Sequence, residues 1–122
     1  MQLSTSELVF IEAENYSLLE NLEVDLFINI ASMQEMNPEV IDKYFKYMRS
    51  SKKSPCYFYC CNRLEKELPD GSIIKFMNYP WKNNDDVLID ELCPWYKKYP
   101  SLKPPFFRKY DGPIQHRFVK IK

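Results

Sequence analysis

Glycine and histidine are both scarce in this 122-residue chain, which contains two glycines and a single histidine. The glycines, Gly71 and Gly112, stand far apart, so the chain has no glycine-rich turn of the kind that lets a backbone approach a bound nucleotide. None of the four cysteines forms a CxxC pair, which excludes a zinc knuckle of that spacing. The 17 basic and 17 acidic side chains balance, so we expect no nucleic-acid partner.

Long apolar runs are absent as well. No stretch approaches the roughly 20 apolar residues that a membrane-spanning helix needs. The first ten residues, MQLSTSELVF, lack the basic and apolar regions of a signal peptide. The sequence therefore predicts a cytoplasmic protein with no membrane partner. In that reducing compartment we expect the cysteines to remain free thiols that pack as small hydrophobes.

The apolar pattern predicts a single α/β domain over residues 1–122. Residues 8–11 (LVFI) are typical of a short strand. Residues 24–31 (VDLFINIA) are nearly all apolar, which is typical of a strand buried on both faces in a parallel sheet. Residues 57–61 (YFYCC) predict another buried strand.

A helix is predicted between the last two strands. Asn37 can cap it, Pro38 suits its first position, and it should end near Arg49. One face of this helix is apolar at helical spacing, and the residues of that face are Val40, Ile41, Tyr44, Phe45 and Met48. Strand, helix and strand together predict a βαβ unit with two parallel strands.

The second half of the chain is less regular. A turn at residues 68–71 (LPDG) should join short strands near residues 65–68 and 73–77. Asn84 and Asp85 are expected to cap a short helix over residues 87–92.

The last seven residues alternate in a way that predicts a final strand. One face of it would carry His116, Phe118 and Lys120, and the other would carry Arg117, Val119 and Ile121.

Four stretches of this sequence together resemble the sugar O-methyltransferase family. They are DLFINIASMQEMNPEVIDKYFKYMR, YFYCCNR, DELCPW and YDGPIQHRF, and the resemblance covers about residues 24–121. Members of that family are Rossmann-like enzymes that move a methyl group from S-adenosylmethionine to a sugar hydroxyl. The resemblance implies that this chain acts on a sugar or glycoconjugate with S-adenosylmethionine as cofactor.

The resemblance also implies which part of the fold is here. Residues 24–31 are similar to the fourth strand of a class I methyltransferase sheet, and residues 57–61 to the fifth. We therefore expect the second half of a Rossmann-like sheet, with a βαβ unit followed by β-hairpins and an antiparallel C-terminal strand. The glycine-rich turn of the first half, which holds the cofactor, is absent from this chain.

Ligands of open parallel sheets bind beyond the carboxyl ends of the strands. The segment after the first of the two parallel strands is polar, and the family resemblance implies that it faces the methionine end of the cofactor. Its candidate cofactor-binding residues are Ser32, Met33 and Gln34.

A hydroxyl group is a poor nucleophile until a base removes its proton. His116, within GPIQHR, is one candidate base, and Glu35, just beyond the first parallel strand, is the other. Each has an ordinary structural alternative, because His116 could be a buried strand residue and Glu35 a surface carboxylate.

Several residues are candidates for substrate binding. Asn62 could hold a sugar hydroxyl, and Arg63 could pair with Glu35 or with an anionic substrate group. Trp81 and Trp95 carry flat faces of the kind that stack on sugars, although proline-flanked aromatics such as these are more often loop anchors in a core. The acidic candidates are Asp90, Glu91 and Asp111. Asp85, Asp86, Asp90 and Glu91 form an acidic cluster that could hold a divalent cation through oxygen ligands. Such a cluster is more often a capped, solvated short helix, so we expect no metal site.

A non-catalytic function is the alternative. A sheet without its first half leaves an unpaired edge strand and an uncovered apolar face, and both favour association. The expected partner is a second copy of the chain or a missing N-terminal half. The cysteine spacing disfavours a third class, a thiol-based redox module.

Overall fold

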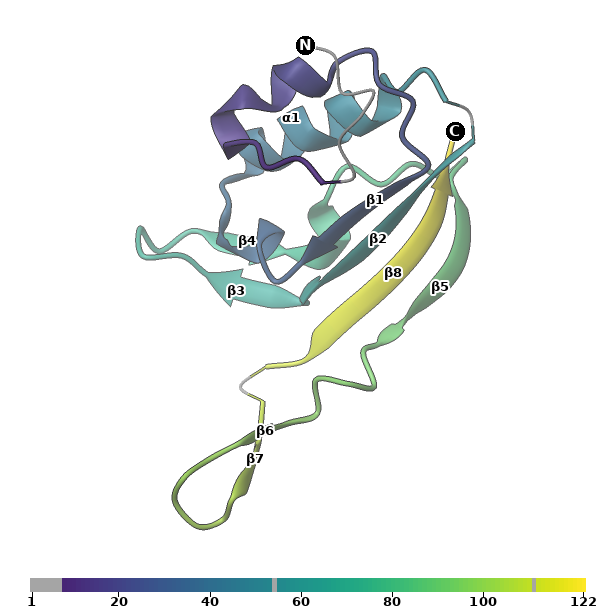
Figure 1. Ribbon diagram of the computed structural model, residues 1–122. Helices are drawn as coiled ribbons and strands as arrows, with labels where there is room; N and C mark the ends of the chain where they lie inside the picture. Colours follow the sequence, from purple (N-terminus) through teal and green to yellow (C-terminus); the bar gives the residue numbers. More distant parts are fainter. Residues whose placement is uncertain (1–7, 54, 111) are drawn as a thin grey trace.

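The computed structural model describes residues 8–53, 55–110 and 112–122, which form a mixed α/β fold. β1 and β2 of its main sheet are parallel, whereas β8 runs antiparallel to both of its neighbours (Figure 1). The order of strands is β1-β2-β8-β5. Their bounds are β1 (Leu26–Ile30), β2 (Cys56–Arg63), β8 (Ile114–Ile121) and β5 (Asp86–Leu92). The mixed α/β class and the antiparallel C-terminal strand expected from the sequence are confirmed.

Helix α1 (Pro38–Arg49) connects β1 to β2, so the predicted βαβ unit is confirmed. Pro38 takes the first helical position, as expected. Asn37 precedes it with an extended backbone, but its side chain makes no capping hydrogen bond to the described part of the chain. The buried face of the helix consists of Ile41, Phe45 and Met48. The described residues also form three 3-10 helices: η1 (Ala13–Leu19), η2 (Met33–Glu35) and η3 (Phe76–Asn78).

The main hydrophobic core lies between α1 and one face of the sheet. Phe45 packs edge to face on Phe58 and on Trp81, with ring centroids 5.5 and 5.1 Å apart. Val119 and Ile121 of β8 are buried in the same cluster. One set of alternate residues of the final strand therefore faces the core, as predicted.

The opposite face of the sheet is open at β1. The side chains of Leu26, Ile28 and Ile30 are 44%, 61% and 48% exposed. The prediction that this strand is buried on both faces is wrong, because no described element packs over these three residues and β1 is an edge strand. The apolar character of β1 thus produces an exposed apolar surface instead of a second core.

Two hairpins extend from the main sheet. β3 (Glu65–Glu67) pairs antiparallel with β4 (Ile73–Lys75), which confirms the predicted hairpin. Gly71 in its turn has a φ of 83°, a left-handed conformation that glycine adopts without steric penalty. β6 (Lys98–Pro100) pairs with β7 (Phe107–Lys109), and this second hairpin projects from the body of the protein (Figure 1).

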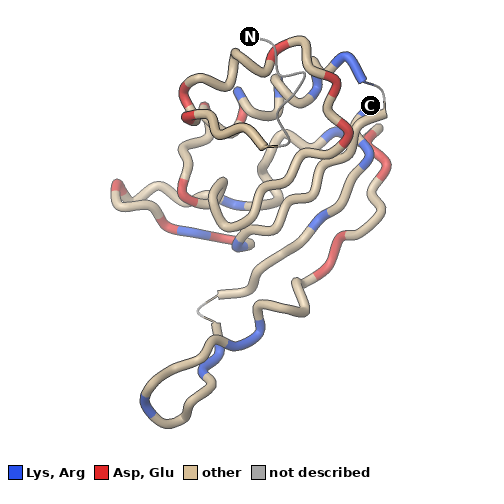
Figure 2. The backbone as a smooth tube through the Cα atoms, in the orientation of Figure 1, with Lys and Arg blue, Asp and Glu red and all other residues tan. Residues whose placement is uncertain are grey.

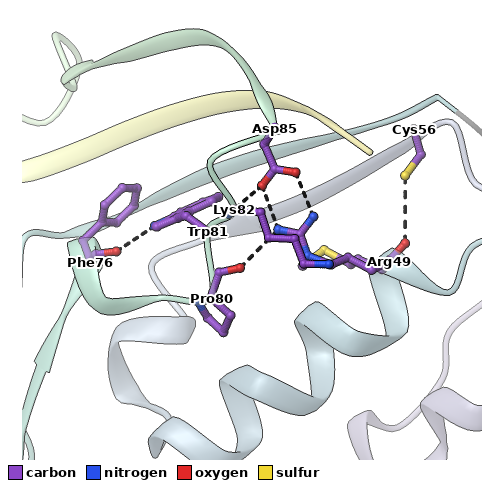
Figure 3. Close-up of polar contacts among 8 residues, drawn as sticks. Arg49, Cys56, Phe76, Pro80, Trp81, Lys82 and Asp85 are labelled. Atoms are coloured by element: carbon purple, nitrogen blue, oxygen red, sulfur yellow. Dashed lines mark hydrogen bonds and ion pairs between the residues drawn. The ribbon is translucent and has the colours of Figure 1, made fainter.

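The chain between η3 and β5 is fixed by a buried ion pair. Asp85 binds the guanidinium of Arg49 and accepts a hydrogen bond from the backbone N–H of Lys82 at 3.0 Å (Figure 3). The prediction of a helix over residues 87–92 is wrong. Because the Asp85 carboxylate is held by Arg49, it does not cap a helix, and the following residues pair with β8 as a strand.

The N-terminal strand prediction is also wrong. Residues 8–11 are described, but they belong to no strand. Within the described ranges, no helix is long and apolar enough to cross a membrane.

Candidate functional site

The carboxyl ends of β1 and β2 are joined by a network of side-chain amides. Asn62 is fully buried. Its amide nitrogen donates to Oδ1 of Asn29 at 2.9 Å, and its Oδ1 accepts the backbone N–H of Gln34 at 3.2 Å. Gln34 in turn accepts the backbone N–H of Arg63 at its Oε1, at 2.8 Å. The polar residues that follow the two strands therefore bind each other across the sheet end.

This network determines which predicted site residues can reach a ligand. Asn62 is enclosed by its partners, and Gln34 is buried and also donates to Glu35 at 3.3 Å. Met33 lies in the hydrophobic core. The hydroxyl of Ser32 accepts a hydrogen bond from Asn29 at 2.6 Å and keeps its own hydrogen available. At this end of the sheet, Ser32, Glu35 and Arg63 are the predicted residues with partly exposed side chains.

A nucleotide-like cofactor needs a stretch of backbone that it can approach closely. The described residues do not supply such a stretch at the carboxyl ends of β1 and β2. Gly71 lies in the β3–β4 turn, and Gly112 lies beside the guanidinium of Arg63. Neither glycine is in the segment that follows β1. The residues present therefore do not fit a complete S-adenosylmethionine site. No cluster of three or more metal-binding side chains occurs in the described ranges.

His116 lies on the open face of the sheet, at the level of the carboxyl ends of the parallel strands. It pairs with Cys61 of β2, which itself pairs with Ile30, the last residue of β1. On the other side it pairs with Glu91 of β5. His116 therefore lies on the strand beside the carboxyl end of β2. A base that acts at this end of the sheet must lie near that position.

Two side chains bind the imidazole of His116. The hydroxyl of Tyr59 lies 3.2 Å from Nδ1, and Oε1 of Glu91 lies 3.4 Å from Nε2. The imidazole is nearly buried, whereas the side chain of Glu91 is 68% exposed. Tyrosine, histidine and glutamate thus form a chain of three polar groups that crosses β2, β8 and β5.

The contact with Glu91 sets the direction of these hydrogen bonds in a neutral ring, because a carboxylate only accepts and Nε2 must then be the donor. Burial, with smaller contributions from the nearby thiols of Cys61 and Cys93, raises the pKa of Tyr59 to about 12. The phenol is therefore protonated near neutral pH and can donate to Nδ1 of His116. A neutral imidazole then carries its hydrogen on Nε2 and donates it to Glu91. This is the hydrogen-bonding order of a carboxylate, an imidazole and a hydroxyl in general-base catalysis.

The thiol of Cys61 does not compete as a nucleophile. Burial, with the adjacent Cys93, raises the pKa of Cys61 to about 11, so its reactive thiolate form is rare near neutral pH. Cys61, Cys93 and Ile114 form a second, smaller apolar cluster beside His116.

The sequence suggests that Glu35, Asn62, Arg63 and His116 converge on one cleft, but the structure does not bring these four residues together. Side chains alternate along β2, so Asn62 faces α1 while Arg63 and Cys61 share the face of His116. Glu35 pairs with Lys66 at 3.4 Å and not with Arg63. The open face combines His116 and Arg63, and the amide network occupies the other face.

Two of the remaining predicted substrate residues, Asp90 and Trp81, are engaged in contacts within the protein. Asp90 forms an ion pair with Arg117 at 2.7 Å, and the Arg117 guanidinium lies 4.6 Å from the ring centroid of Trp81. The Trp81 indole donates to the carbonyl of Phe76 at 2.9 Å. Asp90 and Trp81 therefore stabilise the core side of the sheet.

Glu91 and Trp95 are accessible, but only Glu91 contacts His116. Trp95 is 82% exposed in the segment that leads to β6. Asp111, the last predicted residue, lies outside the described residues. The sequence did not single out Tyr59, because only the register between β2 and β8 shows that it lies beside His116.

Comparisons with protein-family models, with curated proteins and with solved structures found no match to this chain.

Proposed function

We propose that this chain is the acceptor-side part of an S-adenosylmethionine-dependent sugar O-methyltransferase. The arrangement of the main sheet carries the proposal. β1 and β2 are parallel and joined through α1, and the C-terminal strand β8 lies antiparallel beside β2. This is the arrangement expected for the second half of a Rossmann-like methyltransferase sheet, and the open edge of β1 is where the first half would pair.

His116 is the proposed general base. A sugar hydroxyl that replaces the Tyr59 hydroxyl at Nδ1 would be within reach of the imidazole, which removes its proton as the oxygen becomes a nucleophile. Glu91 holds the Nε2 hydrogen and stabilises the imidazolium that results. Arg63, on the same face, is available for an anionic group of the substrate.

The methyl donor is proposed to be held by residues that this chain does not supply, because the segment after β1 offers no glycine-lined backbone. We also propose that the protein acts in the cytoplasm. Its four cysteines are buried as free thiols, a state that is typical of reducing compartments.

Proton NMR of the single histidine tests the proposed acceptor site. The imidazole C–H signals belong to His116 alone, so a titration with a panel of methyl glycosides reports directly on this residue. We expect at least one glycoside to shift the His116 signals together with the backbone amides of Glu91 and Arg63. The Tyr59→Phe variant should bind that glycoside several-fold more tightly, because it lacks the competing hydroxyl.

Two results would contradict this proposal. One is that no glycoside shifts His116, even at tens of millimolar. The other is that the glycosides shift only the indole of Trp95, which would indicate nonspecific stacking on an exposed ring. The Trp95→Ala variant is the control, since its His116 response should equal that of the unmodified chain.

The second candidate function is self-association or partner binding without catalysis. The observation that favours it is the edge strand β1, whose exposed face carries Leu26, Ile28 and Ile30. A strand without charge or proline at a sheet edge can pair with another chain. The two functions are compatible, because the same edge would pair with a first half in a complete enzyme.

A further inference from the structure

The hairpin formed by residues 97–110, called the arm below, carries positive charge only. It contains five basic residues, and the sequence has no acidic residue between Glu91 and Asp111. In Figure 2 the arm shows blue segments and no red ones, whereas both colours are mixed over the rest of the chain. The chain as a whole has no net charge, so positive charge is concentrated locally in the arm. Its basic residues are Lys97, Lys98, Lys103, Arg108 and Lys109.

These basic side chains are not neutralised within the described part of the chain. Each salt bridge there uses a cation outside the arm, such as Arg49, Lys66 or Arg117. The strands of the arm are exposed throughout. Five cations are therefore presented to solvent on one projecting hairpin.

Exposed apolar side chains lie at the tip of the arm and beside it, together with one tip cation, Lys103. Leu102 is 101% exposed, and Phe106 and Phe107 are 61% and 69% exposed. An exposed leucine beside two exposed phenylalanines is unusual on a water-facing hairpin, because burying such side chains is favourable. Exposed apolar side chains of this kind are typical of a surface that becomes buried against a second apolar surface.

The chemistry of the arm changes along its length. The apolar residues Leu102 and Phe106 belong to the loop beyond the two strands, whereas the pair Lys98 and Lys109 faces across its base. Tyr99 packs on Tyr110 at the same base, with ring centroids 5.7 Å apart. Apart from Lys103, which lies in the tip loop between Leu102 and Phe106, the order is apolar tip, then tyrosine and cations. A membrane interface favours this order, with apolar groups at the acyl chains and cations at the phosphates.

A cavity at the base of the arm adds a site for an anionic group. It has a volume of about 430 Å³ and is lined in part by Lys97, Lys98 and Lys109, with Tyr96 and Tyr110 beside them. Three lysines around one open cavity favour a phosphate or carboxylate over a neutral ligand. The cavity lies behind the apolar tip, at the level that lipid headgroups would occupy if the tip were inserted.

We propose that the arm is a binding site for anionic lipid surfaces. Leu102, Phe106 and Phe107 insert at the headgroup boundary, and the five cations contact anionic headgroups. The sequence-based expectation of no membrane partner rested on the lack of a spanning helix, which binding at the interface does not require. A nucleic acid would use the cations but not the exposed leucine at the tip, so the lipid is favoured. The lipid site is independent of the proposed methyl transfer, because it uses different residues.

Vesicle sedimentation tests this proposal. The probes are vesicles of phosphatidylcholine alone and vesicles that also contain phosphatidylserine. We expect binding at least about tenfold tighter with phosphatidylserine, and we expect added salt to weaken it. The combined variant Leu102→Ser, Phe106→Ser and Phe107→Ser should lose at least about tenfold of this binding. Replacing the arm cations by glutamine should abolish the preference for phosphatidylserine.

Matched substitutions outside the arm provide the controls. Phe10→Ser removes an aromatic that is also highly exposed, and Lys43→Gln with Lys46→Gln removes exposed charges from α1. Both controls should bind vesicles as the unmodified chain does, and circular dichroism should show that all variants fold. Equal or absent binding to the two vesicle types would overturn the proposal. Binding that the arm variants leave unchanged would also overturn it, as would binding of single-stranded oligonucleotide without vesicle binding.

Discussion

Asp85 accepts hydrogen bonds from both terminal guanidinium nitrogens of Arg49, at 2.8 and 2.7 Å (Figure 3). The two side chains are only 2% and 12% exposed. One of these Arg49 nitrogens also donates to the carbonyl of Pro80 at 3.1 Å. The last residue of α1 is thereby bound to the segment that leads into β5, and the helix and the far edge of the sheet are fixed relative to each other.

Replacing Asp85 by asparagine should strongly destabilise the fold. The change leaves the buried Arg49 charge without its counter-charge, and the loss of one partner of a buried pair costs about 3 kcal/mol. Urea unfolding near neutral pH measures this loss. The neighbouring change Asp86→Asn is the control, because Asp86 pairs with Lys122 at 2.8 Å with both side chains about half exposed. That exposed pair should contribute less than about 1 kcal/mol. Equal losses in the two variants would contradict the structural role of Arg49.

Lowering the pH should remove the stabilisation that the Arg49–Asp85 pair provides. Burial alone would raise the pKa of Asp85, but the hydrogen bonds from Arg49 and from the Lys82 backbone outweigh it and hold the pKa below its usual value. The folded state therefore binds fewer protons than the unfolded state, and the pair stabilises the fold fully above about pH 4. As the pH falls from there through the lowered pKa, the stability difference between the unmodified chain and Asp85→Asn should shrink. A difference that stays constant down to acidic pH would show that Asp85 is not the titrating group.

Helix α1 was predictable from the sequence, whereas strand β5 was not, and the reasons are physical. The apolar face of α1 repeats within a few residues, and Pro38 marks its start, so local sequence suffices. The residues of β5 follow a local capping signal at Asp85, but the carboxylate is bound by Arg49, which is 36 residues away. The strand forms because β8 pairs with it. Contacts so distant in the chain are not visible in a local pattern.

The candidate site was predictable only in part. The alternation of the last strand correctly assigned His116 and Val119 to opposite faces. The register that brings Tyr59 and Glu91 to the imidazole depends on strand pairing, which one sequence does not reveal. Asn62 was expected to bind a ligand because polar residues at strand ends often do. In the structure it is saturated by Asn29 and Gln34, since a buried amide must be hydrogen bonded.

The tautomer of His116 follows from its two partners, Glu91 and Tyr59. Nitrogen-15 NMR of the neutral ring should show the hydrogen on Nε2, because the Glu91 carboxylate accepts at Nε2 and Nδ1 is then left to accept from the Tyr59 hydroxyl. In Tyr59→Phe this donor is lost, and the form with the hydrogen on Nδ1 should become more populated. Glu91→Gln retains an oxygen acceptor at Nε2 and should change the tautomer little. A predominant Nδ1–H form in the unmodified chain would reverse the hydrogen-bonding order that the proposed base requires.

The edge strand β1 should make this chain associate with itself. Its outer edge is unpaired in the described part of the chain, and Ile28 lies at its centre with 61% exposure. Ile28→Lys should weaken association at least about tenfold, since a charged side chain opposes strand pairing at an edge. Sedimentation velocity over a range of concentrations measures this. Leu88→Lys on β5 is the control, because that edge already has a register shift beside Leu88 and three acidic residues. An unmodified chain that remains monomeric at high concentration would contradict the prediction.

A paired calorimetric titration tests most directly whether this chain carries the acceptor side of a methyltransferase without its donor side. The chain is titrated with S-adenosylmethionine and, separately, with the methyl glycoside that shifts His116. We predict heat of binding for the glycoside and none for S-adenosylmethionine, because the described residues lack a backbone site for the cofactor. Micromolar binding of S-adenosylmethionine to this chain alone, or no binding of any glycoside, would contradict it.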